Sequence, residues 1–367
     1  MFKRNYIAGI IVCLLFSCNV CLLFSCNTKK TEKVGFEIRY FDNYKEVIVN
    51  NPWINAEEHY FLVADKNIEV PEGGQKILIP LQSLAATSCT HFEFLYLLGE
   101  GQTITGICSP KLVYNADIRK RYAASEIKNL GDAIDMNFEN TLLLHPDAVM
   151  VSGYSQNNEK EKRIAQAGIP IIYNNEWRET TLLKRAEWIK FVAAFYNKER
   201  EADSIFNLIE QHYNAVSQKA KAVQGKPTIL SGANFKGTWY MSGGQSYMGQ
   251  LFADAGADYF YKDDDTRESL PLSFEMVLQN FQNADVWVGA FADSKQELIN
   301  SDERYALFSA VKNNQVYNVK KRTTPSGGND FWEGAIAHPD LILSDLIKIL
   351  HPEVLPDYEL VYMKKLE

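Results

Sequence analysis

The chain has 367 residues, of which 46% are hydrophobic and 23% charged, and its formal net charge is −8. These proportions are typical of a globular protein, and the acidic balance disfavours a nucleic-acid partner, because such binding begins when Lys and Arg neutralise phosphates. A chain of this length is expected to form two domains rather than one.

The first 26 residues are expected to be a lipoprotein signal peptide. Lys3 and Arg4 precede an apolar run at residues 7–16, which is the pattern of a secretory leader. The octet Val-Cys-Leu-Leu-Phe-Ser-Cys-Asn occurs at residues 12–19 and again at 20–27, and each copy contains Leu-Phe-Ser-Cys, which resembles the lipobox of bacterial lipoproteins. Cys26 is the expected lipidation site rather than Cys18, because polar residues follow it directly. An uncleaved membrane anchor is the alternative.

Cys89 and Cys108 are the two cysteines outside this leader. Export would permit a disulfide between them, and two free thiols fit the sequence equally well. Two cysteines at this spacing do not make a zinc site, and neither is expected to be a nucleophile.

Residues 27–75 are expected to form a polar tether followed by strands, because apolar and polar residues alternate at 36–40 and 45–49 and a further strand follows at 60–64. From residue 76 the pattern changes to strands that alternate with helices. Strands are expected at 77–81, 104–107, 148–151 and 169–173, with helices at 90–98, 137–144 and 159–166. This alternation predicts a first lobe, residues 76–180, with a parallel sheet covered by helices on both faces.

Residues 181–224 are expected to be a helical connection. They contain almost no helix breaker, and apolar residues such as Trp188, Val192 and Phe195 recur at helical spacing. The second helix of this region would reach about 35 Å at 1.5 Å per residue. The strand–helix alternation then resumes in a second lobe, residues 225–367. Its strands are expected at 228–230, 286–288 and 315–319, and its helices at 246–255, 273–280 and 338–350.

The two lobes share a short repeat. Asn137-Phe-Glu139 and Ser273-Phe-Glu275 each begin a predicted helix that leads into a strand. The predicted fold class is therefore α/β, with two parallel-sheet lobes joined by a long backbone helix and a ligand cleft between them.

The chain resembles the class III periplasmic substrate-binding proteins of iron-siderophore and vitamin B12 ABC transporters. Residues 83–99, 129–151 and 272–278 carry the resemblance, which extends over roughly residues 76–352. It implies a lipid-anchored periplasmic protein that delivers a small-molecule metal chelate to an ABC permease dimer and, through it, to its ATPase. A ferric siderophore or haem is the expected cargo, and cobalamin is the alternative. The resemblance also implies that Glu139 and Glu275 dock on the permease, whereas ordinary solvated glutamates near a helix N-terminus are the alternative.

The ligand is expected in loops at the carboxyl ends of the strands, where open α/β sheets bind their ligands. Aromatic rings in these loops suit a planar or hydrophobic chelate, although loop packing explains any single ring equally well. Arg322 would pair with an anionic group of the chelate or else be an ordinary surface arginine, and Asp330 falls near the position of an acid in cobalamin-binding members. The expected contact residues are Ser88, Thr90, His91, Tyr114, Tyr154, Trp177, Trp239, Tyr240, Tyr247, Phe291, Arg322, Asp330 and Trp332.

No bare-metal site, resident cofactor or catalytic residue is expected. The six histidines are scattered along the chain, whereas a metal centre needs them clustered. The stretch from Gly243 to Gly249 departs from the Gly-x-Ser-x-Gly pattern of hydrolases because Met248 replaces the last glycine, so Ser246 is expected to cap a helix instead. A hydrolase or an envelope scaffold lipoprotein is the alternative of another class.

Overall fold

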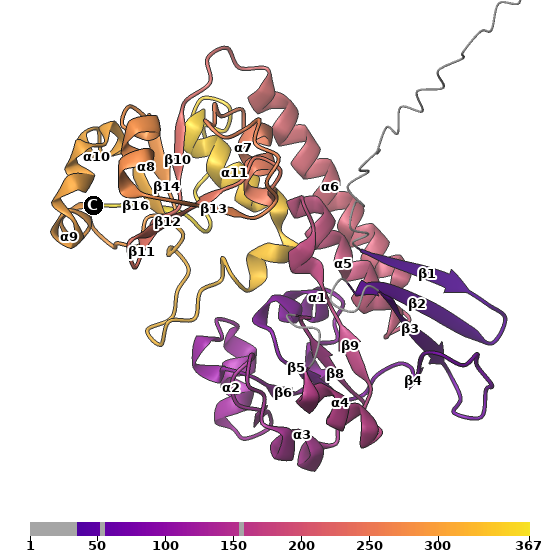
Figure 1. Cartoon of the computed structure of the whole chain (residues 1–367). Coiled ribbons are helices and arrows are strands. Elements are labelled where there is room, and N and C mark those ends of the chain that lie inside the picture. Colours follow the sequence, from indigo (N-terminus) through magenta and orange to yellow (C-terminus); the bar gives the residue numbers. More distant parts are fainter. Residues whose placement is uncertain (1–34, 52–55, 154–157) are drawn as a thin grey trace, which may run out of the picture. The chain divides into compact units, whose positions relative to one another are not determined.

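The computed structural model describes residues 35–51, 56–153 and 158–367. Cys26 and Tyr154 lie outside these residues, so the expected lipidation site and one expected ligand contact are not placed. Residues Val34–Glu367 form one compact unit, and its elements are shown in Figure 1. Among the helices of the described residues, none combines the length and the apolar character needed to cross a membrane.

A four-stranded sheet opens the described chain in the order β1-β2-β3-β4, with only β3 and β4 parallel. Its strands are β1 (Phe36–Tyr40), β2 (Tyr44–Asn51), β3 (Ala56–Val63) and β4 (Gln75–Leu78). Val47, Tyr60 and Ile77 belong to the same buried cluster as apolar residues of the first lobe, and the Gln75 amide bonds both backbone groups of Ile171 at 2.9 and 3.0 Å. The expected boundary at residue 76 thus falls inside β4, and this sheet packs as part of the first lobe.

The first lobe contains a five-stranded parallel sheet in the order β7-β6-β5-β8-β9. Its strands are β5 (Leu84–Ala86), β6 (Ile104–Ile107), β7 (Lys128–Asn129), β8 (Ala148–Val151) and β9 (Ile171–Tyr173). Its helices are η1 (Cys89–His91), α1 (Phe92–Leu97), η2 (Gly101–Thr103), η3 (Pro110–Leu112), α2 (Ala116–Ala123), α3 (Phe138–Leu144), α4 (Glu159–Gln166) and η4 (Glu176–Arg178). Every residue of β5 and β8 is buried, as expected for strands covered on both faces.

The helical connection consists of α5 (Leu182–Ala194) and α6 (Glu199–Lys221). The turn between them contains Asn197, whose φ of 56° lies in the left-handed region that interrupts a helix. The 23 residues of α6 correspond to about 35 Å. In Figure 1, α6 lies beside α5 at one end and beside α7 (Tyr247–Asp254) and α11 (Pro339–Leu350) of the second lobe at the other.

The second lobe has a sheet in the order β10-β14-β15-β16, parallel except for β16. Its strands are β10 (Ile229–Ser231), β14 (Val286–Val288), β15 (Val316–Asn318) and β16 (Lys364–Lys365). A separate antiparallel sheet consists of β11 (Asn234–Phe235), β12 (Thr238–Ser242) and β13 (Ser269–Leu272). The remaining helices are α8 (Phe274–Phe281), α9 (Lys295–Ser301), η5 (Glu303–Leu307), α10 (Ser309–Lys312) and η6 (Gly334–Ala337).

The repeat seen in the sequence has the same local structure in both lobes. Asn137 caps α3 and Ser273 caps α8, each by accepting a hydrogen bond from a backbone N–H three residues later. Glu139 and Glu275 are therefore the second residues of their helices. Two parallel-sheet lobes joined by a long helix confirm the predicted fold class.

Candidate ligand-binding site

A cavity of about 440 Å³ lies at the carboxyl ends of β10, β14 and β15 in the second lobe. Its wall includes Ser231, the last residue of β10, and Gly232 after it, Gly289 after β14, and Val319 and Lys320 after β15. This is the edge at which a parallel sheet presents its loops to a ligand. The cavity is therefore the leading candidate for the binding site.

Aromatic side chains dominate the cavity wall. Phe235, Tyr240, Phe291 and Trp332 line it with between 51% and 64% of each residue exposed, and Tyr247 lies half-buried beside them. A single exposed ring is ordinary, but several exposed rings grouped on one wall are typical of an interaction or ligand-binding site. The wall thus offers flat apolar surfaces to a ligand. Four of these rings, all except Phe235, were among the expected contact residues.

Trp239 does not face the cavity, contrary to the prediction. It is fully buried, its indole N–H donates to the backbone carbonyl of Ser231 at 2.9 Å, and its ring lies 5.3 Å from that of Trp287. Trp239 and Tyr240 are neighbours in β12, and side chains alternate between the two faces of a strand. Only Tyr240 can therefore reach the cavity, while Trp239 packs into the core.

A smaller pocket of about 250 Å³ lies at the corresponding edge of the first lobe. Thr87 follows β5 and Ser152 follows β8. These two strands are neighbours in the sheet, and the next strand along the chain lies on one side for β5 and on the other side for β8. Lys160 and Glu161 of α4 complete its polar side, and Lys160 pairs with Asp135. The first lobe thus has its own strand-end pocket, which is more polar than the cavity of the second lobe.

His91, an expected contact, lies behind this pocket rather than in it. The residue is fully buried, and its Nε2 lies 3.3 Å from the Ser152 hydroxyl. Burial lowers the pKa of His91 to about 3, so the ring is neutral at physiological pH. Ser88 and Thr90 flank it in the same turn with their hydroxyl oxygens 2.9 Å apart, and neither lines either strand-end pocket.

Arg322 and Asp330, both expected to contact ligand, form an ion pair at 2.8 Å with each other. The Arg322 guanidinium also lies 5.5 Å from the ring of Tyr114, so these three expected residues come together away from the cavity wall. Trp177 is half-buried in η4, with the Arg178 guanidinium 5.3 Å from its ring. The pairing of Arg322 with Asp330 weakens the case for either as a ligand contact.

Both cysteines of the described chain are free thiols, so the disulfide that the sequence left open is not formed. The Cys89 thiol donates to the carbonyl of Trp332 at 3.6 Å, and the Cys108 thiol to that of Leu130 at 3.7 Å. Burial raises the pKa of each thiol to about 12. Both are therefore protonated at physiological pH and unreactive as thiolates.

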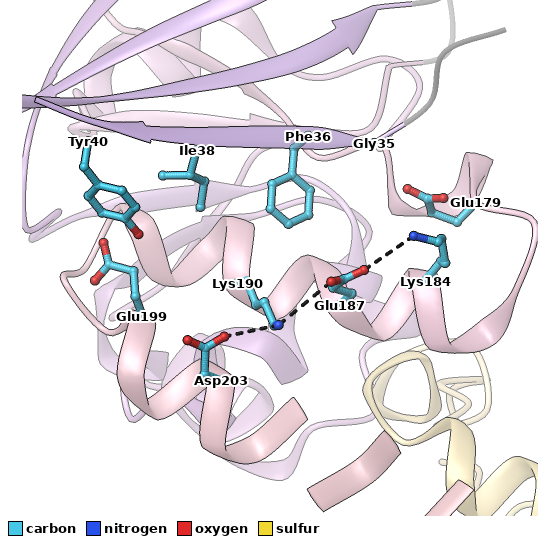
Figure 2. A pocket seen from close by; sticks show the side chains of 10 residues that line it. All are labelled: Gly35, Phe36, Ile38, Tyr40, Glu179, Lys184, Glu187, Lys190, Glu199 and Asp203. Atoms are coloured by element: carbon cyan, nitrogen blue, oxygen red, sulfur yellow. Dashed lines mark ion pairs between the residues drawn. The ribbon is translucent and has the colours of Figure 1, made fainter. Parts of the chain in front are cut away.

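A third hollow, of about 470 Å³, lies between β1 and the helices α5 and α6 (Figure 2). Phe36, Ile38 and Tyr40 of β1 form one side, and charged residues of the helices form the other. The charged side chains of the helices form ion pairs with one another, since Lys190 pairs with Asp203 at 3.1 Å and with Glu187. This groove lies away from the strand ends, and its charges already have partners, so it is a weaker candidate.

Glu139 and Glu275 are exposed at matching positions of the two lobes. Glu275 pairs with Arg304 at 3.3 Å. The Glu275 carboxylate also has a pKa below its ordinary value, chiefly because of a hydrogen bond to its own backbone N–H at the helix start. Both side chains are accessible to a partner that binds the two lobes together.

Several cavity residues were not expected from the sequence. Met248, Lys320 and Met363 line the cavity, and Met363 arrives from the end of the chain, where no local pattern marks a site. Phe235 lies in β11, and its aromatic character was the available signal. Among the described residues, no group of three or more His, Cys, Asp or Glu side chains is arranged to hold a metal ion.

Comparisons with known proteins agree with this geometry. An uncharacterised lipoprotein of Methanocaldococcus jannaschii is 26% identical over 317 residues, covering 82% of this chain and 74% of the relative. A periplasmic heme-binding protein from Pseudomonas aeruginosa has a TM-score of 0.58 at 14% identity, covering 78% of this chain and 98% of that chain. An ABC transporter substrate-binding protein from Listeria monocytogenes has a TM-score of 0.54 at 20% identity, covering 74% of this chain and 99% of that chain.

The family model described as periplasmic binding protein matches residues 84–323, which contain the first-lobe pocket, the helical connection and most of the lining of the second-lobe cavity. The family and the similar structures are binding proteins. The chain belongs to the periplasmic binding protein family, and its two α/β lobes are joined by a long helix.

Proposed function

We propose that this protein is a lipid-anchored substrate-binding protein of an ABC importer. It captures an iron chelate, which is either haem or a ferric siderophore, and delivers it to the permease. The observation that carries the proposal is the aromatic cavity of the second lobe. Its exposed rings match a ligand with a large flat or hydrophobic surface, because aromatic faces bind such surfaces by stacking and by excluding water.

The charges around the cavity also bear on the cargo. Lys320 is the charged residue on the cavity wall, and its ammonium lies 3.3 Å from an Asp293 carboxylate oxygen. In the first-lobe pocket Lys160 of α4 supplies an amine, next to the carboxylate of Glu161. One amine at each strand-end pocket suits a chelate with an apolar body and anionic groups at its edge. Similar solved structures are described as heme-binding proteins, from Pseudomonas aeruginosa and Vibrio cholerae, which supports this class of cargo.

Delivery would use the paired glutamates. Glu139 and Glu275 occupy equivalent exposed sites at the starts of α3 and α8, so a two-fold symmetric permease would meet one carboxylate on each lobe. Charge-assisted pairs with arginines of the permease would then select the protein and orient it. The lipid anchor on Cys26 would hold the protein at the periplasmic face of the membrane, and relatives from Methanocaldococcus jannaschii that are named lipoproteins support it.

The proposal is tested by tryptophan-fluorescence titration of the chain from Asn27 onward with haemin, a panel of ferric siderophores and cobalamin. The W332F variant is the matched control, because Trp332 is the indole that lines the cavity. Saturable one-to-one quenching at sub-micromolar ligand by an iron chelate, mostly lost in W332F, is the expected result. Saturation by cobalamin alone would show that the cargo is cobalamin rather than an iron chelate. Saturation by none of them would refute the assignment to metal chelates and favour a scaffold role.

A further inference from the structure

Residues 322–338, here called the strap, join the second lobe to the first. Phe331 is buried in the core cluster of the second lobe, whereas Ile336 and Ala337 are buried in the core of the first lobe. The family model ends at residue 323, so nearly all of the strap lies beyond the residues that define the family. Its role therefore has to be read from its own contacts.

Trp332 is the strap residue that lines the aromatic cavity. On one side its ring meets that of Phe331 edge-on, with centroids 4.8 Å apart. Its backbone carbonyl accepts a hydrogen bond from the Cys89 thiol of the first lobe at 3.6 Å. The ring thus belongs to the cavity of one lobe, while its backbone is held by the other.

Glu333 is the next residue, and it makes the closest polar contact between the lobes at this point. Its carboxylate oxygens accept the backbone N–H groups of Tyr114 and Asn115 at 2.6 and 2.7 Å. These two amides immediately precede α2, and Asn115 caps that helix. Glu333 is 3% exposed, so both hydrogen bonds are shielded from water and are stronger than surface bonds would be.

We propose that Glu333 is a positioning residue for the aromatic cavity. By clasping the Tyr114 and Asn115 amides it fixes the strap against the first lobe and sets Trp332 in the cavity wall, so that ligand affinity depends on the closed arrangement of the lobes. This inference rests on the proposed function, because it assigns regulation to the same cavity. It assigns to Glu333, which does not line the cavity, control over the position of Trp332 in the cavity wall.

The contact of Glu333 with the Tyr114 and Asn115 amides, here called the clasp, lies among other titratable groups. They are Asp330, Arg322 and His338 on the strap, Glu93 on α1, and the Cys89 thiol on η1. Arg322 pairs with Asp330 at 2.8 Å and His338 lies 3.0 Å from Glu93, so Glu333 has no cation of its own in these pairs. Burial raises the pKa of Glu333 from 4.5 to about 7, with smaller contributions from Asp330 and Glu93, while the two amide hydrogen bonds act in the opposite direction.

The raised pKa fixes the direction of a pH effect. If the clasp opens, the carboxyl returns to water and to its ordinary pKa, so the closed form binds a proton that the open form does not hold. Closure is therefore fully favoured below pH 4.5 and loses this advantage as the pH rises through about 7. Between pH 6 and pH 8 the ratio of the closed to the open form falls by about tenfold, and ligand affinity falls by at most the same factor, because it follows the fraction of closed protein.

The test measures haemin affinity of the full chain in detergent between pH 6 and pH 8, for the wild type, E333Q and E333A. The exposed glutamate Glu72 provides the matched control E72Q. Once the titration of haemin itself is divided out, we expect affinity to fall several-fold, and at most about tenfold, across this range in the wild type and E72Q. In E333Q the change across the same range should be less than about twofold. E333A should bind about tenfold more weakly at pH 6 because two amides lose their acceptor. An unchanged pH profile in E333Q would overturn the proposal.

A ligand-free measurement separates this inference from the proposed function. Hydrogen exchange of the Tyr114 and Asn115 amides, corrected for intrinsic rates, should accelerate in E333A and lose its extra pH dependence in E333Q. Acrylamide quenching of Trp332, obtained by subtracting W332F, should rise in E333A. If haemin and the other chelates fail to bind the wild type, the cargo assignment fails while these two readouts still support the clasp. Exchange that is equal in wild type and E333A would overturn the clasp even if haemin binds.

Discussion

The pockets at the ends of the two sheets differ, although the lobes share one plan. Each lobe begins the repeated unit with a capped helix whose second residue is a glutamate, followed by a buried strand. In the second lobe the strand ends open into an aromatic cavity of about 440 Å³, whereas in the first they open into a pocket of about 250 Å³ that mixes apolar residues with Lys160 and Glu161.

The two pockets differ because different segments outside the repeated helix and strand line them. The antiparallel sheet β11-β12-β13 brings Phe235 and Tyr240 to the cavity, and the strap brings Trp332. The first-lobe pocket instead takes Asn158, Lys160 and Glu161 from α4 and its start. The shared units position the strand ends, and the loops decide the chemistry presented there. The second lobe would bind the apolar face of a chelate and the first lobe its polar edge.

The largest expected effect comes from the feature that the lobes share. Replacing Glu139 and Glu275 together by Lys should reduce uptake of the chelate by cells or proteoliposomes containing the permease to background, because both expected charge pairs become repulsive. Ligand affinity should change by less than about twofold, since neither side chain lines a strand-end pocket. The E72K variant controls for charge. Loss of affinity in the double variant would show that the docking assignment is wrong.

The next effect distinguishes the core of the second lobe from its cavity. W239A should lower the free energy of unfolding by about 3–5 kcal/mol, because it leaves a cavity beside Trp287 and removes the donor to the Ser231 carbonyl. Y240A, one residue along the strand, should change stability by less than about 0.5 kcal/mol and weaken ligand binding instead. Urea unfolding and fluorescence titration of both variants check this pair. Comparable loss of stability in Y240A would contradict the alternation that separates the two side chains.

Much of the framework could be predicted from the sequence because its signals are local. The bounds of β6, β8, β14 and α4 match the predicted ranges, since each is a short run of apolar or helix-forming residues between clear breaks. Two helices were predicted for residues 181–224, but the position of the break at Asn197 was not, because a single left-handed residue leaves the apolar spacing on either side of it unchanged.

The site was only partly predictable, since its residues meet through long-range packing. Tyr240, Phe291 and Trp332, which were predicted as ligand contacts, all line the cavity, yet the sequence could not show that Arg322 would pair with Asp330. Nor could it show that Glu333 would bond the amides of a loop more than two hundred residues earlier. Partners of buried charges are decided by the whole fold rather than by neighbouring sequence.

The role of the aromatic cavity of the second lobe can be tested by truncating its aromatic side chains. F291A combined with W332A should weaken chelate binding by about 30- to 1,000-fold, given roughly 1–2 kcal/mol for each of the two rings that stack on the ligand. I134A, in the first-lobe pocket, removes an exposed apolar residue of the other lobe and should change affinity by less than about threefold. Fluorescence or absorbance titration measures both. Equal losses in the two variants would mean that the lobes share the apolar contact.

The smallest effect concerns the polar side. K160M should weaken binding of an anionic chelate by about two- to fivefold, because Lys160 lies at the pocket rim with Asp135 as its partner and its charge is partly screened. K162M, two residues along α4 and outside the pocket, is the matched control. The loss in K160M should shrink as salt rises from 50 to 500 mM, because screening already weakens the same charge in the wild type. A loss that does not depend on salt would indicate that Lys160 acts by packing its methylene stem against Met136. In that case the first lobe, like the second, would contact the ligand through apolar surface, and the distinction between the two pockets would be one of shape rather than of charge.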